Sequence, residues 1–229
     1  SSTSAAALIG GGRAIPLPGE ISLAHAGVLF LDELPEFNRQ ALESLREPLE
    51  SGEIVLSRSR QQLRYPARFQ LVAAMNPCPC GQRGQADGSC RCTPEQMSRY
   101  QARLSGPLLD RLDLRVAVQP VPLSALAAEA VAGESSAVVR ARVCASRARQ
   151  QARQGYANAC LPGHELSQML TPAVTRFAQA AGERLGLSAR AYHRVLRVAR
   201  TVADLALAEG IDSAHVAEAL CYRGSVLTD

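Results

Sequence analysis

A chain of 229 residues with 47% hydrophobic and 20% charged residues has the composition of a soluble globular protein with one large domain or two smaller ones. It has no apolar run near the roughly 18 residues of a membrane span. Its first residues lack the pattern of a secretory signal, so we expect a cytoplasmic protein without a membrane partner. The net charge of +4 permits an anionic partner such as nucleic acid or nucleotide, although an arginine-rich composition explains it equally well.

Short apolar runs alternate with helical patterns in the first half of the chain, which predicts an α/β fold. Asn38 is positioned to cap a helix that ends at Gly52, and Thr93 to cap a helix that begins at Pro94 with a capping box. Four strands are expected, at residues 27–31, 53–56, 69–75 and 112–118.

From about residue 120 onward the strand signals vanish and apolar residues recur at helical spacing. We therefore expect two domains, an α/β unit at residues 1–120 and an all-helical unit at residues 121–229. Ser188 and Ser213 are the expected N-caps of the last two helices. The helices are predicted near residues 136–154, 171–181, 188–208 and 213–223.

An unbroken apolar run, GVLFL, ends abruptly at Asp32 and Glu33. Acidic residues that directly follow a buried parallel strand lie at the carboxyl edge of the sheet, where ligands bind. In phosphoryl-transfer ATPases one such acid holds Mg²⁺, and its neighbour orients or deprotonates the attacking water. We assign the metal role to Asp32 and the base role to Glu33. The alternative is an acidic turn that only starts a helix.

Four of the seven cysteines form two C-x-C pairs that are separated by nine residues: Cys78, Cys80, Cys90 and Cys92. Four thiolates can close a tetrahedral zinc site. The spacing is tighter than the usual C-x-x-C, so free thiols or an occasional disulfide are the alternatives. The intervening loop has almost nothing apolar to bury and is expected to need the metal for order.

The chain resembles the magnesium-chelatase-like AAA+ ATPases, especially the ComM/YifB branch. This likeness rests on residues 13–33, on residues 65–77 (YPARFQLVAAMNP), on residues 105–113 (SGPLLDRLD) and on the C-terminal helices. It covers nearly the whole chain. It implies a partial AAA+ P-loop NTPase core, with a parallel sheet and β-hairpin insertions, followed by an all-helical lid. It also implies ATP and Mg²⁺ as cofactors and a homo-oligomeric ring, expected to be a hexamer.

Three further site residues follow from this resemblance. Asn76 matches the sensor that touches the γ-phosphate or the attacking water, a role compatible with capping the turn before Pro77. Arg111, in LLDRLD, resembles the arginine finger shared with the MCM helicases, whose planar guanidinium reaches a neighbour's nucleotide. Arg190 resembles the second sensor of the lid and would contact phosphate in the ATP site.

The chain contains no lysine and therefore no G-x-x-x-x-G-K-[ST] phosphate-binding loop. By the resemblance, it begins partway through the ATPase domain, so we expect this fragment alone to be inactive. Two segments would face the channel of a ring, residues 10–18 with Arg13 and a hairpin at residues 53–69 with Arg58 and Arg60 near its tip. These arginines would bind DNA phosphates without reading sequence. The alternative is an ordinary solvated hairpin.

The ComM branch implies an ATP-driven motor for branch migration of DNA during recombination and natural transformation. The main alternative is the motor subunit of magnesium chelatase, which drives metal insertion into a porphyrin through a partner protein. The cysteine loop and the arginines of the hairpin tip favour the DNA branch. A third alternative is a binding module without enzymatic activity that uses only the sensor and lid surfaces.

Overall fold

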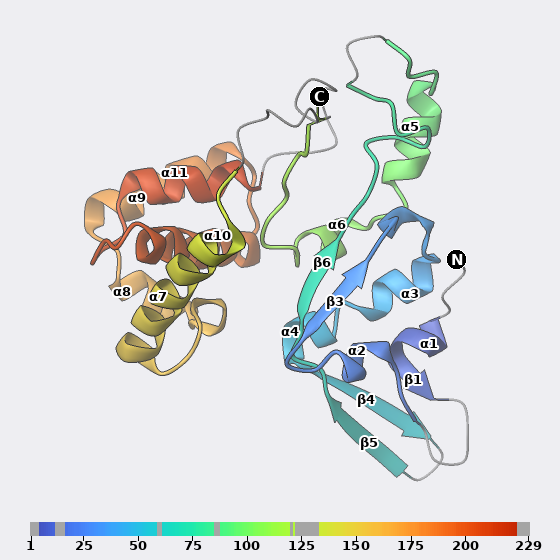
Figure 1. The fold of residues 1–229 in the computed structure, drawn as a ribbon, viewed down its shortest axis with the longest axis horizontal. Coiled ribbons are helices and arrows are strands. Elements are labelled where there is room, and N and C mark those ends of the chain that lie inside the picture. Colours follow the sequence, from blue (N-terminus) through green and yellow to red (C-terminus); the bar gives the residue numbers. More distant parts are fainter. Residues whose placement is uncertain are drawn as a thin grey trace. The chain divides into compact units, whose positions relative to one another are not determined.

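The structure, a computed structural model, describes residues 5–11, 17–58, 61–84, 88–119, 121 and 133–223, without the side chains of Arg58 and Gln61. The chain divides into two compact units, residues 1–112 and 113–229 (Figure 1). Residue 120, after which the sequence predicts the boundary, lies outside the described residues, and this boundary stays a prediction. Among the described residues, no helix has the length and apolar character needed to cross a membrane.

Two parallel strands lie at the centre of the first unit. β3 (Val28–Leu31) pairs with β6 (Gln70–Ala73), so that Leu31 lies opposite Ala73 (Figure 1). Leu29 and Leu31 are buried on one face of this pair, whereas Val28 and Phe30 are 62% and 59% exposed on the other. The pair is therefore covered on one face only, although parallel sheets are usually covered on both.

The first unit also contains two separate antiparallel pairs. β1 (Gly10–Gly11) pairs with β2 (Leu17–Pro18), and β4 (Glu53–Arg58) pairs with β5 (Gln61–Pro66). The β4–β5 pair confirms the expected hairpin, which reaches away from β3 and β6 (Figure 1). Residues 59 and 60 at its tip, including Arg60, lie outside the described residues.

Short helices cover the buried face, and their starts follow local sequence signals. Asn38 accepts a hydrogen bond from the N–H of Ala41, and Thr93 forms a capping box with Gln96, so both expected caps are confirmed. The helices of this unit are α1 (Ala5–Ile9), α2 (Glu20–Leu23), α3 (Arg39–Ser44), α4 (Pro48–Ser51), α5 (Pro94–Gln101) and α6 (Gly106–Leu109), with a 3-10 turn at Leu34–Glu36.

The helix expected to run unbroken from Asn38 to Gly52 is two helices, α3 and α4. Pro48 begins the second one, because a proline has no N–H for the preceding turn and its ring clashes there. Gly52 ends α4 with φ at 73°, a left-handed conformation that suits glycine. Beneath these helices lies the core of the unit, built mainly by Ile21, Leu29, Leu31, Leu34, Ala41, Leu42, Leu45, Leu104 and Leu108.

The strand expected at residues 112–118 is wrong. The described residues there pair with no described strand, and the N–H of Arg115 donates to the carbonyl of Tyr222 at 2.9 Å. Leu114, Val116 and Val118 are 53%, 62% and 87% exposed. An alternating apolar run forms a strand only when a neighbouring edge pairs with it, and no described edge does so.

The described part of the second unit is helical, as expected. Ser188 caps α10, but the last helix is capped by Asp212 rather than by Ser213, because Asp212 forms a capping box with His215. The helices are α7 (Ser136–Gln154), α8 (Gly163–Gln168), α9 (Pro172–Arg184), α10 (Ala189–Leu205) and α11 (Ser213–Cys221), with a 3-10 turn at Asn158–Cys160. Their core is built mainly by Leu161, Leu166, Val174, Val195, Leu196 and Val216.

Beside this core, one buried carboxylate joins three helical segments. Asp204 of α10 is fully buried and accepts hydrogen bonds from both terminal nitrogens of Arg153 on α7, at 2.7 and 2.9 Å. Arg200 and Asn158 donate to the same carboxylate at 2.9 and 2.8 Å. A charge buried in this way is tolerated because each oxygen is hydrogen-bonded to a cation or an amide.

Candidate functional site

The acidic pair lies directly after β3, as the apolar run predicts. Asp32 and Glu33 are both exposed, and the N–H of Glu33 donates to Oδ1 of Asp32 at 2.9 Å. Glu33 has φ at 51° and ψ at 48°, a left-handed conformation that is unfavourable for a residue with a side chain. The next residue bonds to the segment just after β6, because the N–H of Leu34 donates to the carbonyl of Ala74 at 2.9 Å.

Asn76 follows β6 and is exposed as well. Because β3 and β6 are parallel neighbours, with Leu31 opposite Ala73, the residues after each strand emerge at the same edge of the sheet. Carboxylate and amide oxygens at such an edge are the donors that Mg²⁺ prefers. The structure therefore brings Asp32, Glu33 and Asn76 to one edge, which we call the nucleotide edge.

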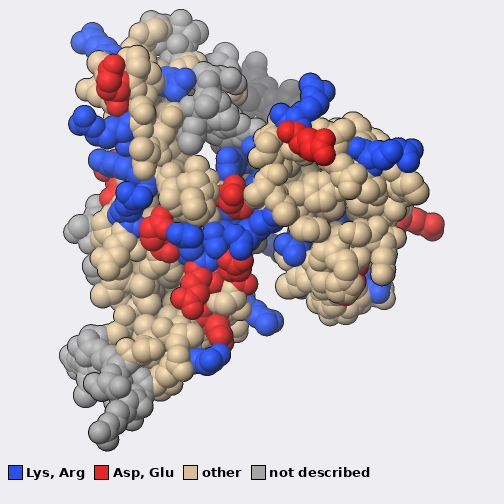
Figure 2. Space-filling model, turned by 180° about the vertical axis from the view of Figure 1, so that it is seen from behind, with Lys and Arg blue, Asp and Glu red and all other residues tan. Residues whose placement is uncertain are grey.

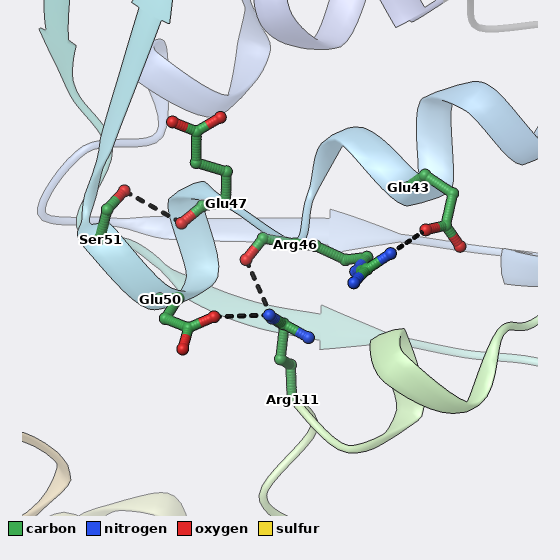
Figure 3. A pocket seen from close by; sticks show the side chains of 6 residues that line it. All are labelled: Glu43, Arg46, Glu47, Glu50, Ser51 and Arg111. Carbon is green, nitrogen blue, oxygen red and sulfur yellow. Dashed lines mark hydrogen bonds and ion pairs between the residues drawn. The ribbon is translucent and has the colours of Figure 1, made fainter. Parts of the chain in front are cut away.

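Arg111 is buried against its own chain. Its Nε donates to the carbonyl of Arg46 at 3.0 Å and its Nη1 to the carbonyl of Pro107 at 2.7 Å. Its Nη2 pairs with a carboxylate oxygen of Glu50 on α4, at 2.5 Å (Figure 3). The finger role of Arg111 stays a prediction, and the structure adds that its guanidinium would first have to leave these acceptors.

This arginine lines a charged pocket in the first unit. Figure 3 shows Glu50 and the carbonyl of Arg46 turned toward its guanidinium, while Arg46 pairs with Glu43. The pocket is lined by Glu43, Arg46, Glu47, Glu50, Ser51 and Arg111. Sequence reasoning missed Glu50, because no local pattern indicates a partner that lies 61 positions away along the chain.

The other predicted site residues are described only in part. Arg190 is the second residue of α10, in the second unit, and is exposed. Arg58 is the last residue of β4 and its side chain is outside the described part, as are Arg13 and Arg60. On the face shown in Figure 2, arginines lie among acidic side chains, so the described residues present no continuous basic surface there.

The four cysteines converge, although two of them follow Asn76 and Pro77 and two come before α5. The Sγ atoms of Cys78 and Cys80 are 3.4 Å apart, and Sγ of Cys90 lies 3.7 Å from each of them. With Cys92, all four sulfurs lie within 4.8 Å of one another. A tetrahedral zinc site with bonds of about 2.3 Å has sulfurs about 3.8 Å apart. The cluster therefore has the size of a metal site, and all its cysteines are free thiols.

The ionisation of the cluster is uneven. The backbone N–H of Gln82, followed by the thiols of Cys92 and Cys78, lowers the pKa of Cys80 to about 6. The hydrogen bond with Cys80 raises the pKa of Cys92 to about 12. Within this coupled pair the proton is therefore held more tightly at Cys92 than at Cys80. A divalent cation held by the four sulfurs would favour their thiolate forms.

Comparison with known proteins finds relatives over nearly the whole chain. Residues 1–126 match the family model of magnesium chelatase, subunit ChlI, and residues 133–223 match that of the ChlI C-terminal region. The chain is 53% identical to YifB of Salmonella typhimurium over 224 residues, which cover 97% of this chain and 44% of that protein. It is 51% identical to the competence protein ComM of Haemophilus influenzae over 227 residues, which cover 98% of this chain and 44% of that protein.

A shorter match relates 60 residues, at 38% identity, to the magnesium-chelatase 38 kDa subunit of Acidiphilium rubrum, covering 26% of this chain and 17% of that protein. The chain therefore belongs to the magnesium-chelatase-like family, in its ComM and YifB branch. The expected resemblance is confirmed. The chain spans less than half the length of YifB and ComM.

Proposed function

We propose that the chain is part of an ATP-hydrolysing AAA+ motor that forms a ring, expected to be a hexamer, and acts on DNA. The observation that carries this proposal is the parallel pairing of β3 with β6, which brings two carboxylates and an amide to one edge. Family membership supports the ATPase class. The competence protein ComM, with half of the aligned residues identical, supports a role in DNA uptake or recombination.

The residues of the nucleotide edge take different roles in this proposal. Asp32 holds Mg²⁺, which neutralises charge on the phosphates when it is bound with ATP. Glu33 accepts the proton of the attacking water, and Asn76 orients that water by hydrogen bonding. The left-handed backbone at Glu33 supports a functional demand there, since strained conformations persist where the surrounding structure holds them. Arg190, from the lid, and Arg111, from a neighbouring subunit, would bind phosphate oxygens.

Two open apolar surfaces support a further part of the proposal, that the rest of the ATPase domain covers them. Val28 and Phe30 leave one face of the parallel strands exposed, and Leu114, Val116 and Val118 form an alternating run without a described strand partner. A segment with a phosphate-binding loop would supply the missing strand and cover. Because no lysine is present here to neutralise the phosphates, we expect this chain alone to be inactive.

The proposal also takes the metal of the cysteine cluster to be Zn²⁺. Four thiolates suit a soft divalent ion held in a tetrahedron, and such a closed site has no open position for a water or substrate. Its function would therefore be structural. No histidine or carboxylate among the described residues joins the four sulfurs as a further ligand.

The hairpin tip is where DNA would bind. Arg58 and Arg60 would contact backbone phosphates in the channel, with affinity that falls steeply as salt rises. The alternative, a chelatase motor that remodels a protein partner, is favoured by the shorter match to the magnesium-chelatase subunit. Stimulation of the ATPase by DNA rather than by a protein partner distinguishes the two.

The test is ATP turnover by the intact protein with and without branched DNA at two salt concentrations. We expect stimulation that weakens at the higher salt and is lost when Arg58 and Arg60 are replaced by alanine. Arg64→Ala is the matched control, because Arg64 lies on β5 of the same hairpin and pairs with Glu53 at 3.0 Å. Robust turnover that is indifferent to DNA would overturn the DNA role and favour the chelatase alternative.

A further inference from the structure

The cysteine cluster is attached to the nucleotide edge at both of its ends. Cys78, which is fully buried, comes two residues after Asn76, and Cys92 immediately precedes Thr93, the N-cap of α5. Any ion that fixes the four sulfurs therefore also fixes the chain on either side of them. The described parts of the loop, residues 78–84 and 88–92, contain few apolar side chains that could fix it otherwise.

The first half of the loop lies against the side chain of Asn76. Gly81 donates its N–H to the carbonyl of Cys78 at 3.0 Å and has φ at 76°. A Cβ atom placed on Gly81 would lie 3.6 Å from Cγ, 3.7 Å from Oδ1 and 3.9 Å from Nδ2 of Asn76. Gly81 thus lies beside the carboxamide of Asn76, at a distance where an added methyl group would reach van der Waals contact with it.

The second half of the loop leads into α5. This part of the chain contacts the segments that follow both β3 and β6. Tyr100 of α5 is buried, and its hydroxyl lies near the backbone of Asn76, which lowers the pKa that burial and the charge of Glu36 raise. Just beyond α5, Nη1 of Arg103 donates to the carbonyl of Pro35 at 3.0 Å and to Glu36 at 2.8 Å. Pro35 and Glu36 form the turn that follows Glu33. Helix α5 and Arg103 just beyond it therefore contact the segments that follow both strands.

We propose that a Zn²⁺ ion bound by Cys78, Cys80, Cys90 and Cys92 positions the sensor Asn76. The ion would replace the protons of the bound thiols and close the loop, with Gly81 beside the carboxamide of Asn76 and α5 against its backbone. Asn76 acts on the water or phosphate, whereas the loop of residues 78–92 acts only through Asn76. This inference rests on the proposed role of Asn76 in ATP hydrolysis and adds the element that holds it.

The first test compares two cysteine variants of the intact protein. Cys80→Ser removes the exposed ligand of the cluster, and Cys144→Ser removes an exposed cysteine of α7 in the other unit. We expect wild type and Cys144→Ser to contain one zinc per chain when purified without chelator. Cys80→Ser should lose most of the zinc, and its kcat should fall about 10- to 100-fold, because misplacing a positioned group has an effect of that size. The KM for ATP should change much less.

The second test leaves every metal ligand in place. Gly81→Ala adds a methyl group beside Asn76, and Gly84→Ala is its matched control in the same loop. Gly84 has φ at 85°, so both variants carry similar backbone strain, but nothing lies within 4 Å of a Cβ at Gly84. We expect both to retain zinc and only Gly81→Ala to lower kcat. Hydrogen exchange at residues 76–81 should rise in Cys80→Ser and stay unchanged in Gly84→Ala.

A different result would overturn each part of the proposal. Wild-type protein without zinc would overturn the metal site. A zinc-free Cys80→Ser variant with normal kcat, or equal effects of Gly81→Ala and Gly84→Ala, would overturn the positioning role. If Asn76→Ala itself leaves ATP turnover unchanged, the proposed role of Asn76 fails instead, whatever the zinc content of the protein.

Discussion

Arg111 and Glu50 form an ion pair in which the arginine side chain is 8% exposed and the glutamate side chain 45%. The guanidinium also satisfies the carbonyls of Arg46 and Pro107, so it joins α4, α6 and the segment between α3 and α4. An arginine proposed to act on a neighbour's nucleotide is therefore also a structural element of its own unit.

Replacing Arg111 should consequently affect stability as well as activity. Arg111→Ala leaves two carbonyls without a donor, and we expect the free energy of unfolding to fall by about 2 kcal/mol. Arg64→Ala is the control, because its pair with Glu53 is exposed on both sides and such pairs contribute less than about 1 kcal/mol. Urea unfolding of the chain measures both. Equal losses would contradict the structural role of Arg111.

Removing the buried carboxylate of the helical unit should lower the free energy of unfolding by more than removing Arg111 does. Asp204→Ala would remove the shared partner of Arg153, Arg200 and Asn158, leaving buried cations uncompensated. We expect a loss of about 3–5 kcal/mol, as for other broken buried pairs. Glu134→Ala breaks an exposed pair with Arg142 and serves as the control. Equal losses of thermal stability in the two variants would show that the buried carboxylate stabilises the unit no more than an exposed ion pair does.

The same carboxylate should make the unit sensitive to acid. Burial alone would raise the pKa of Asp204, but the hydrogen bonds from Arg153 and Asn158 and the charge of Arg200 outweigh it and lower the pKa. As the pH falls, this carboxylate therefore takes up a proton in the unfolded chain, near pH 3.9, before it does so in the folded one. The stabilisation of the folded unit by Asp204 is complete above that pH and is lost as the pH falls further, through the pKa of Asp204 in the folded state. Urea unfolding from pH 6 to pH 3 should show this loss in the wild type, and Asp204→Asn should lack it.

Phe30 tests whether another part of the protein covers the open face of the strands. Its side chain is 59% exposed in this chain, where Phe30→Ala should cost only about 0.5 kcal/mol, as for other surface positions. If the face is covered in the intact protein, the same substitution there should cost about 3 kcal/mol or more. Leu185→Ala, at 58% exposure in the helical unit, is the control and should cost little in both. A small effect of Phe30→Ala in the intact protein would contradict a covered face.

Local signals in the sequence were sufficient for much of this structure. The caps at Asn38 and Thr93 depend on residues within three positions of each other, and the run before Asp32 contains a complete strand. Paired cysteines likewise indicated their own cluster. Because these interactions are short in sequence or chemically distinctive, a single chain without relatives indicates them.

Other features depend on partners that no local pattern specifies. The strand expected at residues 112–118 has the right apolar run but no described edge to pair with. Asp212 rather than Ser213 caps α11, since both residue types cap well and the choice of one position depends on the backbone geometry. The ion pair of Arg111 with Glu50 and the position of Gly81 beside Asn76 are set by the folded chain, so no local pattern indicates them.

The central claim is that Asp32 and Glu33 at the nucleotide edge carry out ATP hydrolysis. The most direct measurement is steady-state ATP turnover by the intact protein with Mg²⁺, compared with its Glu33→Gln variant, which keeps the size of the side chain but cannot accept a proton. We expect clear turnover in the wild type, and a fall in kcat of about 10²- to 10⁴-fold in the variant with ATP binding retained. Turnover that is equal in the two proteins, or absent from both while ATP still binds, would contradict this account.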